Sequence, residues 1–200
     1  HSHVPMRIEI RMKKLNSKSW SWVRVNGLAR RDKQRRPVML VGVWVNITRR
    51  KTAELRAAED RDLFHTLIEH IPDSIYFKNR ESRFVLANTA TANKLGVPTP
   101  ADLTGRTDDY FFDQTMSDIS RKEEMDIMVT GRPIRARLHH ETWLHKDDSW
   151  SQISKFPWYG RNGELKGIVG ISSDVTKLVK TEIKATETAR ILEERNRTLE

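Results

Sequence analysis

The 200-residue sequence contains no cysteine. Disulfides, thiolate metal sites and cysteine nucleophiles are therefore excluded in one step. A reducing, cytoplasmic location fits this composition. The parent protein could still be anchored to a membrane by another part of its chain.

Long apolar runs are missing as well, since no stretch approaches the roughly 18 residues of a membrane-spanning helix. The sequence also has no glycine-rich phosphate loop, no Gly-x-Ser-x-Gly and no His-Glu-x-x-His, so no catalytic site is predicted. The hydrophobic fraction is only 37% and the charged fraction is 32%. This balance favours a small domain with exposed helices over one large core.

Charge is distributed unevenly along the chain. Residues 1–56 hold 15 Lys/Arg and 3 Asp/Glu, a net charge of +12, whereas the remaining 21 Lys/Arg and 24 Asp/Glu give −3. A basic half could bind nucleic acid. We favour a solvated sheet face instead, because Arg7, Glu9 and Arg11 alternate with Ile8 and Ile10 as on a half-exposed strand.

An internal repeat organises the chain. Three short motifs recur at offsets of about 128 to 130 residues: Ser-Trp-Ser at 19–21 and 149–151, Val-Gly-Val at 41–43 with Val-Gly-Ile at 169–171, and Asn-Ile-Thr at 46–48 with Asp-Val-Thr at 174–176. The order of the motifs is the same in both copies. Only the last third of the repeated unit appears twice.

Each copy of this third predicts a three-stranded antiparallel meander. The strands are expected near 134–143, 150–159 and 165–173 in the second copy and near 4–15, 19–30 and 37–46 in the first. Asn162-Gly163 should supply the positive φ angles of a tight hairpin, whereas the glycine-free turn at 31–36 should be looser. A three-stranded sheet is only marginally stable by itself. The first copy must therefore pack on a part of the protein not included here, on the second domain or on another molecule.

Helices are predicted between and after these sheets. An apolar stripe marks residues 47–72 as an amphipathic helix that Pro72 ends. Short strands at 74–78 and 83–87 follow, then helical segments near 89–95, 100–103, 110–112 and 114–129, giving an α+β domain with an antiparallel sheet. The helical carboxylates Glu123, Glu124 and Asp126 are interpreted as a solvated face.

A heptad pattern runs through the last segment, from Val175 to Glu200. Its seam places Leu178, Ala185, Leu192 and Leu199 seven residues apart. This spacing predicts a parallel coiled coil that pairs the chain with a second copy. The alternative is a single amphipathic helix folded on its own domain.

Two stretches resemble the PAS family. Residues 73–131 contain Asp-Ser-Ile-Tyr-Phe-Lys-Asn, Leu-Thr-Gly-Arg-Thr-Asp-Asp-Tyr-Phe-Phe and Thr-Gly-Arg-Pro, which are similar to the front half of bacterial PAS domains. The motifs Asp174-Val175-Thr176 and Asn46-Ile47-Thr48 resemble the Asp-Ile-Thr signature that closes the family's sheet. The resemblance implies a five-stranded antiparallel sheet with helices on one face, and a three-stranded remnant of a preceding PAS domain.

The resemblance also implies a domain organisation and a function. Residues 1–48 would be the end of a first PAS domain, 49–72 a linker helix, 73–176 a complete second PAS domain and 177–200 an output helix. The chain would be a non-enzymatic sensory and dimerisation module. It would relay a signal to an output domain not included here, with a histidine kinase preferred and a diguanylate cyclase next.

The two signature triplets are expected to transmit the signal, because a short oxygen-bearing side chain at the strand exit can cap the next helix. The family further implies a small-molecule pocket between sheet and helices, with eight candidate wall residues: Tyr110, Phe111, Ile119, Met125, Met128, His139, Trp143 and Ile153.

Cofactors remain open at this stage. Cysteine-dependent flavin photochemistry, which light-sensing PAS relatives use, is excluded. Helix 114–129 contains no histidine of the kind that haem-sensing relatives use as an axial ligand. His139 and His140 should point to opposite faces of a strand, so no metal site is expected. A flavin- or haem-binding redox or gas sensor and a nucleic-acid-binding piece are the alternative functions.

Overall fold

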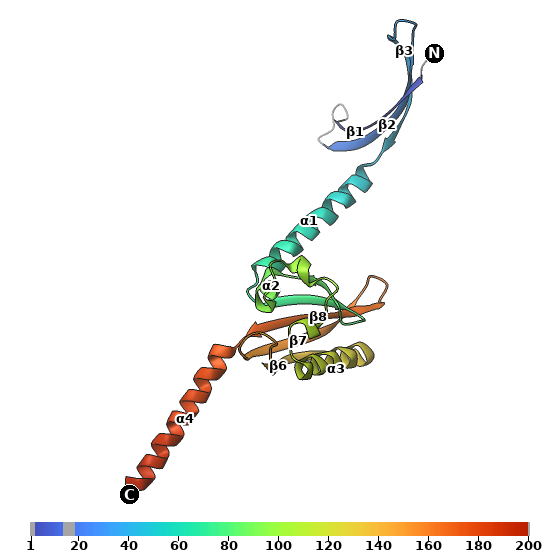
Figure 1. Ribbon diagram of the computed structural model, residues 1–200. Helices are drawn as coiled ribbons and strands as arrows, with labels where there is room; N and C mark the ends of the chain where they lie inside the picture. The colour runs from blue at the N-terminus through green and yellow to red at the C-terminus, as the bar shows by residue number, and fades with distance from the viewer. Residues whose placement is uncertain (1–2, 14–18, 200) are drawn as a thin grey trace. The chain divides into compact units, whose positions relative to one another are not determined.

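The computed structural model describes residues 3–13 and 19–199, which form two compact units, one ending at His65 and the other beginning at Thr66. The first unit holds β1 (His3–Lys13), β2 (Trp20–Arg31) and β3 (Pro37–Asn46) in an antiparallel sheet of order β1-β2-β3 (Figure 1). Helix α1 (Thr48–His70) follows, and its last residues belong to the second unit. The predicted first meander is confirmed.

Strand β3 is exposed along its whole length. Leu40, Val43 and Trp44 each leave more than 60% of their surface open, although they alternate between the two faces of the sheet. An apolar strand of this kind is typical of a sheet covered on both sides. Among the described residues, nothing provides that cover.

The two expected hairpin turns differ from the prediction. In the first unit the Asp32 carboxylate accepts hydrogen bonds from the backbone N–H groups of Gln34 (2.9 Å) and Arg36 (2.8 Å), so the glycine-free turn is held by a side chain. In the predicted Asn162-Gly163 turn of the second unit, Gly163 takes a positive φ of +75°, whereas Asn162 does not. The Gly160 N–H donates to the Glu164 carbonyl at 2.8 Å, which closes a longer turn than the Asn-Gly pair alone suggests.

The second unit contains a five-stranded antiparallel sheet of order β5-β4-β8-β7-β6. Its strands are β4 (Ser74–Asn79), β5 (Phe84–Ala87), β6 (Ile134–Glu141), β7 (Ser149–Tyr159) and β8 (Leu165–Asp174). The three C-terminal strands are adjacent and antiparallel, as the repeat predicts. The predicted α+β class is confirmed.

The helices that matter for the site are α2 (Thr89–Leu95), the short turns η1 (Pro100–Leu103) and η2 (Asp108–Tyr110), α3 (Gln114–Thr130) and α4 (Thr176–Leu199). Asn88 and Asp113 cap α2 and α3 through side-chain acceptors, and Gly96 and Gly131 end them in the left-handed conformation. These caps follow from the residue types. Helix α2 packs on β4, and α3 packs on β7 and β8.

Candidate functional site: a polar cavity and two strand–helix junctions

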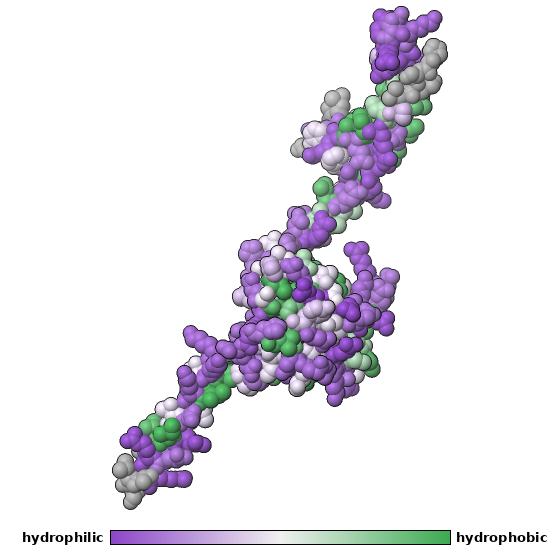
Figure 2. All heavy atoms as spheres, in the orientation of Figure 1, coloured by the Kyte–Doolittle hydropathy of each residue, from purple (hydrophilic) through white to green (hydrophobic). Residues whose placement is uncertain are grey.

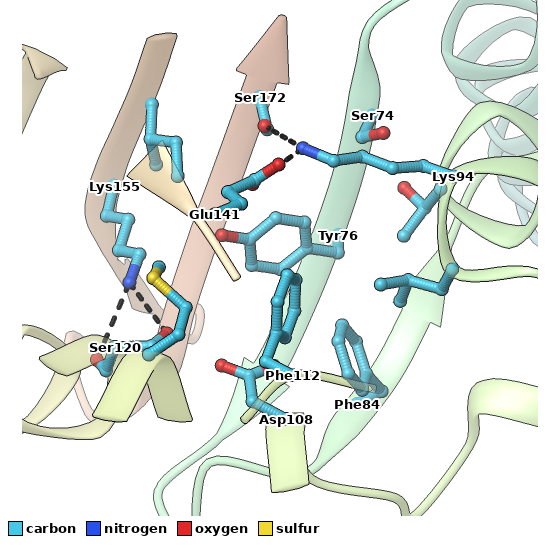
Figure 3. A pocket seen from close by; sticks show the side chains of 14 residues that line it. Ser74, Tyr76, Phe84, Lys94, Asp108, Phe112, Ser120, Glu141, Lys155 and Ser172 are labelled. Carbon is cyan, nitrogen blue, oxygen red and sulfur yellow. Dashed lines mark hydrogen bonds and ion pairs between the residues drawn. The ribbon is translucent and has the colours of Figure 1, made fainter. Parts of the chain in front are cut away.

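A cavity of about 40 Å³ lies between the sheet and the helices of the second unit (Figure 3). This volume suits a few water molecules or a very small ligand. Flavin and haem need pockets of several hundred Å³. The residues that face the cavity include Ser74, Tyr76, Phe84, Lys94, Phe112 and Lys155.

A buried ionic cluster forms one side of this region. The Lys78 ammonium lies 2.7 Å from Asp108 Oδ2 and 2.6 Å from Glu124 Oε1. Lys155 Nζ lies 3.1 Å from Glu123 Oε2 and 3.0 Å from the Ser120 hydroxyl. Burial alone would lower the pKa of Lys78, but Asp108 and Glu124 outweigh burial and hold that pKa above its ordinary value. The charged form of Lys78 is therefore favoured although the side chain is buried.

A second ion pair, with Lys94 half-buried and Glu141 buried, lies across the cavity. Lys94 Nζ donates to Glu141 Oε1 at 2.8 Å and to the hydroxyls of Ser151 and Ser172 at 2.7 Å each. Glu141 Oε2 in turn accepts from Ser149 at 2.9 Å and from Ser151 at 2.8 Å. Each of the three ammonium hydrogens of Lys94 thus has an acceptor.

Glu123 connects the interior to the surface. Its Oε1 accepts from Arg137 at 2.8 Å and lies 3.1 Å from His139 Nε2. Burial would raise the pKa of Glu123, but the hydrogen bond from His139, the charge of Lys155 and the bond from Arg137 together lower it to about 2. The carboxylate is therefore strongly favoured in the folded state.

We expect Glu123 to make the second unit sensitive to acid. A folded-state pKa below the ordinary value contributes stability that is present above pH 4.5 and is lost as the pH falls toward 2. The melting temperature of wild type should therefore fall more steeply between these values than that of Glu123→Gln. Circular dichroism melts at a series of pH values measure this difference, and parallel curves would contradict it.

These carboxylates correct the sequence analysis. Glu123 and Glu124 are buried, whereas the sequence suggested a solvated face; only Asp126 is exposed. The reason is that α3 turns Met116, Ser120, Glu124 and Ile127 toward the sheet, and two of these four positions are polar. Their partners, Lys78 and Lys155, lie on strands distant in the sequence.

The structure places one of the eight predicted wall residues, Ile153, at the cavity. Phe111 is buried in the hydrophobic core, against which Trp143 packs, and His139 is buried beside Glu123. Tyr110, Ile119 and Met125 are exposed, and Met128 is half-buried. The sequence alone did not point to the wall residues Ser74, Tyr76 and Lys94; the first two lie in the PAS-like stretch at 73–79, but nothing in that stretch marks them as facing a cavity.

The two signature triplets form matching junctions. Thr176 N–H donates to Asp174 Oδ1 at 2.8 Å, the Trp150 N–H donates to Thr176 Oγ1 at 2.9 Å, and the Val175 N–H donates to the Trp150 carbonyl at 2.9 Å. Hydrogen bonds from Thr176 hold the pKa of Asp174 below its ordinary value. The start of α4 is thereby fixed to both β7 and β8.

The first unit repeats this arrangement bond for bond. Thr48 N–H donates to Asn46 Oδ1 at 3.0 Å, the Trp22 N–H donates to Thr48 Oγ1 at 2.9 Å, and the Ile47 N–H donates to the Trp22 carbonyl at 2.9 Å. The oxygen-bearing cap follows from the residue types at 46 and 174. The bond between the threonine hydroxyl and the neighbouring strand does not, because the two residues are 26 positions apart.

At its other end, the second unit holds α1 through one buried side chain. Asn88 Nδ2 donates to the carbonyls of Ile68 and Asp73 at 2.9 Å each, while its Oδ1 accepts from the N–H groups of Ile75 and Thr91 at 3.0 Å each. Asn88 is fully buried. It therefore joins the end of α1, β4 and α2.

The predicted seam of α4 is exposed. Leu178 and Leu192 leave 67% and 55% of their surface open, Ala185 is exposed, and the side chain of Leu199 lies outside the described residues. Figure 2 shows apolar side chains on the surface of α4. Exposed apolar residues repeated along a helix suit pairing with another helix.

Among the residues that the structure describes, no helix has the length and apolarity needed to cross a membrane. In the same residues, no three metal-ligating side chains gather into a cluster.

Comparison with known proteins identifies the family. The model of the PAS fold matches residues 68–180, more than half of the chain. The chain therefore belongs to the PAS family, and its second unit is a PAS sensory domain, a regulatory module that is not itself catalytic.

Two curated relatives and one solved structure illustrate the likeness. The methanogenesis regulatory histidine kinase FilI of Methanothrix harundinacea is 23% identical over 129 residues, which cover 64% of this chain and 14% of FilI. A diguanylate cyclase of Vibrio cholerae is 28% identical over 132 residues, covering 64% of this chain and 40% of the cyclase. The Vibrio cholerae VqmA dimer has a TM-score of 0.52 at 22% identity, covering 60% of this chain and 52% of VqmA. The chain thus spans well under two thirds of each.

Proposed function

We propose that the chain is a sensory and dimerisation module that relays a signal through α4 to a C-terminal output domain. The observation that carries this proposal is the junction at Asp174 and Thr176. It joins the sheet to α4 without a flexible residue, because Thr176 bonds to Trp150 on the adjacent strand. A shift of β7 against β8 would therefore move the first turn of α4.

Homodimerisation through the helices is part of the proposal. The seam residues of α4 have no cover within the described chain, and the same holds for Leu55, Leu63 and Leu67 on α1, which all leave more than half of their surface exposed. If α1 pairs with α1 and α4 with α4 of a second copy, the exposed apolar residues of both helices become buried. VqmA, a protein of similar fold, is described as a dimer.

A histidine kinase is the preferred output domain and a diguanylate cyclase the next. The two curated relatives are one of each kind. VqmA is a DNA-binding receptor, so a transcription regulator is a further class of parent to which a PAS unit of this fold can belong.

We further propose that residues 1–48 are the last third of a first PAS domain. By the repeat offset of 128 residues, the exposed Leu40 corresponds to Ile168, which is fully buried in the second unit. The junction at Asn46 and Thr48 also matches that at Asp174 and Thr176. The uncovered face of β3 would then receive the strands and helices that β8 receives from residues 73–131.

The relay can be tested in the full-length parent with Asp174→Ala and Thr176→Val. Both should leave the PAS unit folded and change the basal output activity by at least about fivefold, a modest coupling free energy between distant sites. Autophosphorylation or cyclic dinucleotide synthesis is the measurement, according to the output domain.

Thr181→Val is the matched control, because Thr181 lies on α4 and bonds only within it, to the Lys177 carbonyl. If Thr176→Val behaves like Thr181→Val, the junction is an ordinary helix cap and the relay proposal fails.

A further inference from the structure

Two hydroxyl groups in the cavity lack a hydrogen-bond partner. Ser74 and Tyr76 lie two residues apart on β4, so they share one face of the strand, and both face the cavity. Neither hydroxyl bonds to any residue that the structure describes. The other hydroxyls that line the cavity are all engaged: Thr91 donates to the Ile75 carbonyl, Ser120 accepts from Lys155, and Ser172 accepts from Lys94.

The Tyr76 ring packs against strand β8. It lies over Gly170, its pairing partner on β8, where an added Cβ would overlap Tyr76 Cζ. Burial raises the pKa of Tyr76 well above its ordinary value, and Glu124 raises it further, so the hydroxyl stays protonated at neutral pH. It is therefore a fixed donor as well as an acceptor.

The charged side chains around the cavity are already paired with one another. Four cations, Lys78, Lys94, Lys155 and Arg137, are paired with four carboxylates, Asp108, Glu123, Glu124 and Glu141. Lys94 has used all three of its N–H groups, so it has none left for an anionic ligand. A ligand of either charge would bury an unpaired charge, which is strongly unfavourable.

The remaining walls are apolar. Phe84, Phe112, Met116 and Leu95 face the same space as the two hydroxyls. The volume of about 40 Å³ limits the occupant to a molecule of a few heavy atoms. Figure 3 shows the Tyr76 ring between the Lys94–Glu141 pair and the aromatic wall.

We propose that this cavity binds a small uncharged molecule with a hydrogen-bonding head and an apolar tail, such as a short amide or alcohol, through the hydroxyls of Tyr76 and Ser74. The inference rests on the sensory role proposed above and names the class of ligand that this unit would sense.

Three molecules of the same shape test whether the cavity prefers an uncharged ligand. Acetamide is neutral, acetate is an anion and acetamidinium is a cation, and all have four heavy atoms. Each is titrated at millimolar concentrations into the isotope-labelled full chain, and amide and ring resonances are followed by NMR. Acetamide should shift resonances of Tyr76, Ser74 and Phe112, with intermolecular contacts from its methyl group to the Phe112 ring. Acetate and acetamidinium should bind at least about tenfold more weakly, since each must bury a charge.

Tyr76→Phe keeps the ring and removes the hydroxyl, so acetamide affinity should fall about three- to tenfold, the value of one hydrogen bond. Ser74→Ala should show a similar loss. Tyr159→Phe is the control, because Tyr159 is exposed and lies outside the cavity. It should leave binding unchanged.

Equal or tighter binding of either charged probe would overturn the proposal, as would unchanged acetamide affinity in both Tyr76→Phe and Ser74→Ala, or no binding of acetamide at all. These outcomes are read on the chain alone. They are therefore separate from failure of the relay, which is read from output activity in the parent.

Discussion

Lys78→Met is expected to lower the unfolding free energy of the PAS unit by about 3–5 kcal/mol, the usual cost of removing one partner from a buried ion pair. The substitution preserves the length and the apolar stem of the side chain. It leaves Asp108 and Glu124 without the ammonium that both contact, and Glu124 is fully buried. The loss comes from uncompensated charge rather than from a cavity.

The two units need not unfold together, so the measurement must report the PAS unit alone. Native-state hydrogen exchange of β4 and β8 amides does so. Lys166→Met is the matched control: Lys166 lies 3.6 Å from Glu164 with both side chains about half exposed, and such a pair contributes about 0–1 kcal/mol. Adding Glu124→Met to Lys78→Met should recover part of the loss. A cost for Lys78→Met equal to that of the control would show that the interior is open to water.

Gly170→Ala should displace the Tyr76 ring from its place over β8. The new Cβ would overlap Tyr76 Cζ and lie 2.5 Å from the hydroxyl oxygen of Tyr76. A buried aromatic ring between β8 and the cavity can move only into the cavity. We expect a loss of about 1–3 kcal/mol, the typical cost of overpacking, together with displacement of the Tyr76 ring.

Gly160→Ala provides the comparison. A Cβ at Gly160 would also come too close to its neighbours, at 2.6 Å from Lys166 Cε and 2.9 Å from Glu164 Oε1. Those side chains are flexible and exposed, so they can rotate away, and the effect should stay within about 0.5 kcal/mol. Thermal unfolding gives the stabilities, and the ring resonances of Tyr76 give its position. If both variants lose the same stability, the Tyr76 ring is not fixed over β8.

The backbone of this protein was largely predictable, because its signals are local. The repeated triplets placed both meanders, and Asn88, Gly96 and Gly131 marked helix ends by their own conformational preferences. The hairpin at Gly163 and the turn at Asp32 were misjudged in detail, since a single side chain or one extra residue decides the type of a turn.

The cavity was not predictable in the same way. Lys78 and Glu124 are 46 residues apart and Lys155 and Glu123 are 32 apart, so no pattern along the chain links them. A lysine on a strand normally indicates that this face of the strand is exposed to solvent. One signal was available: Ser74, Tyr76 and Lys78 share one face of β4 opposite Ser172, Gly170 and Ile168, which gives the inner face of the sheet an unusual polar character.

The side chain of Asn88 has a consequence for where the sensor begins. Because its amide donates to the carbonyl of Ile68 as well as to that of Asp73, the last turn of α1 is an integral part of the PAS unit. A second hydrogen bond, from the Thr89 N–H to Glu69 Oε2 at 3.0 Å, joins the same end of α1 to α2. We therefore expect a movement of the end of α1 to reach β4 and α2 through Asn88 and Glu69.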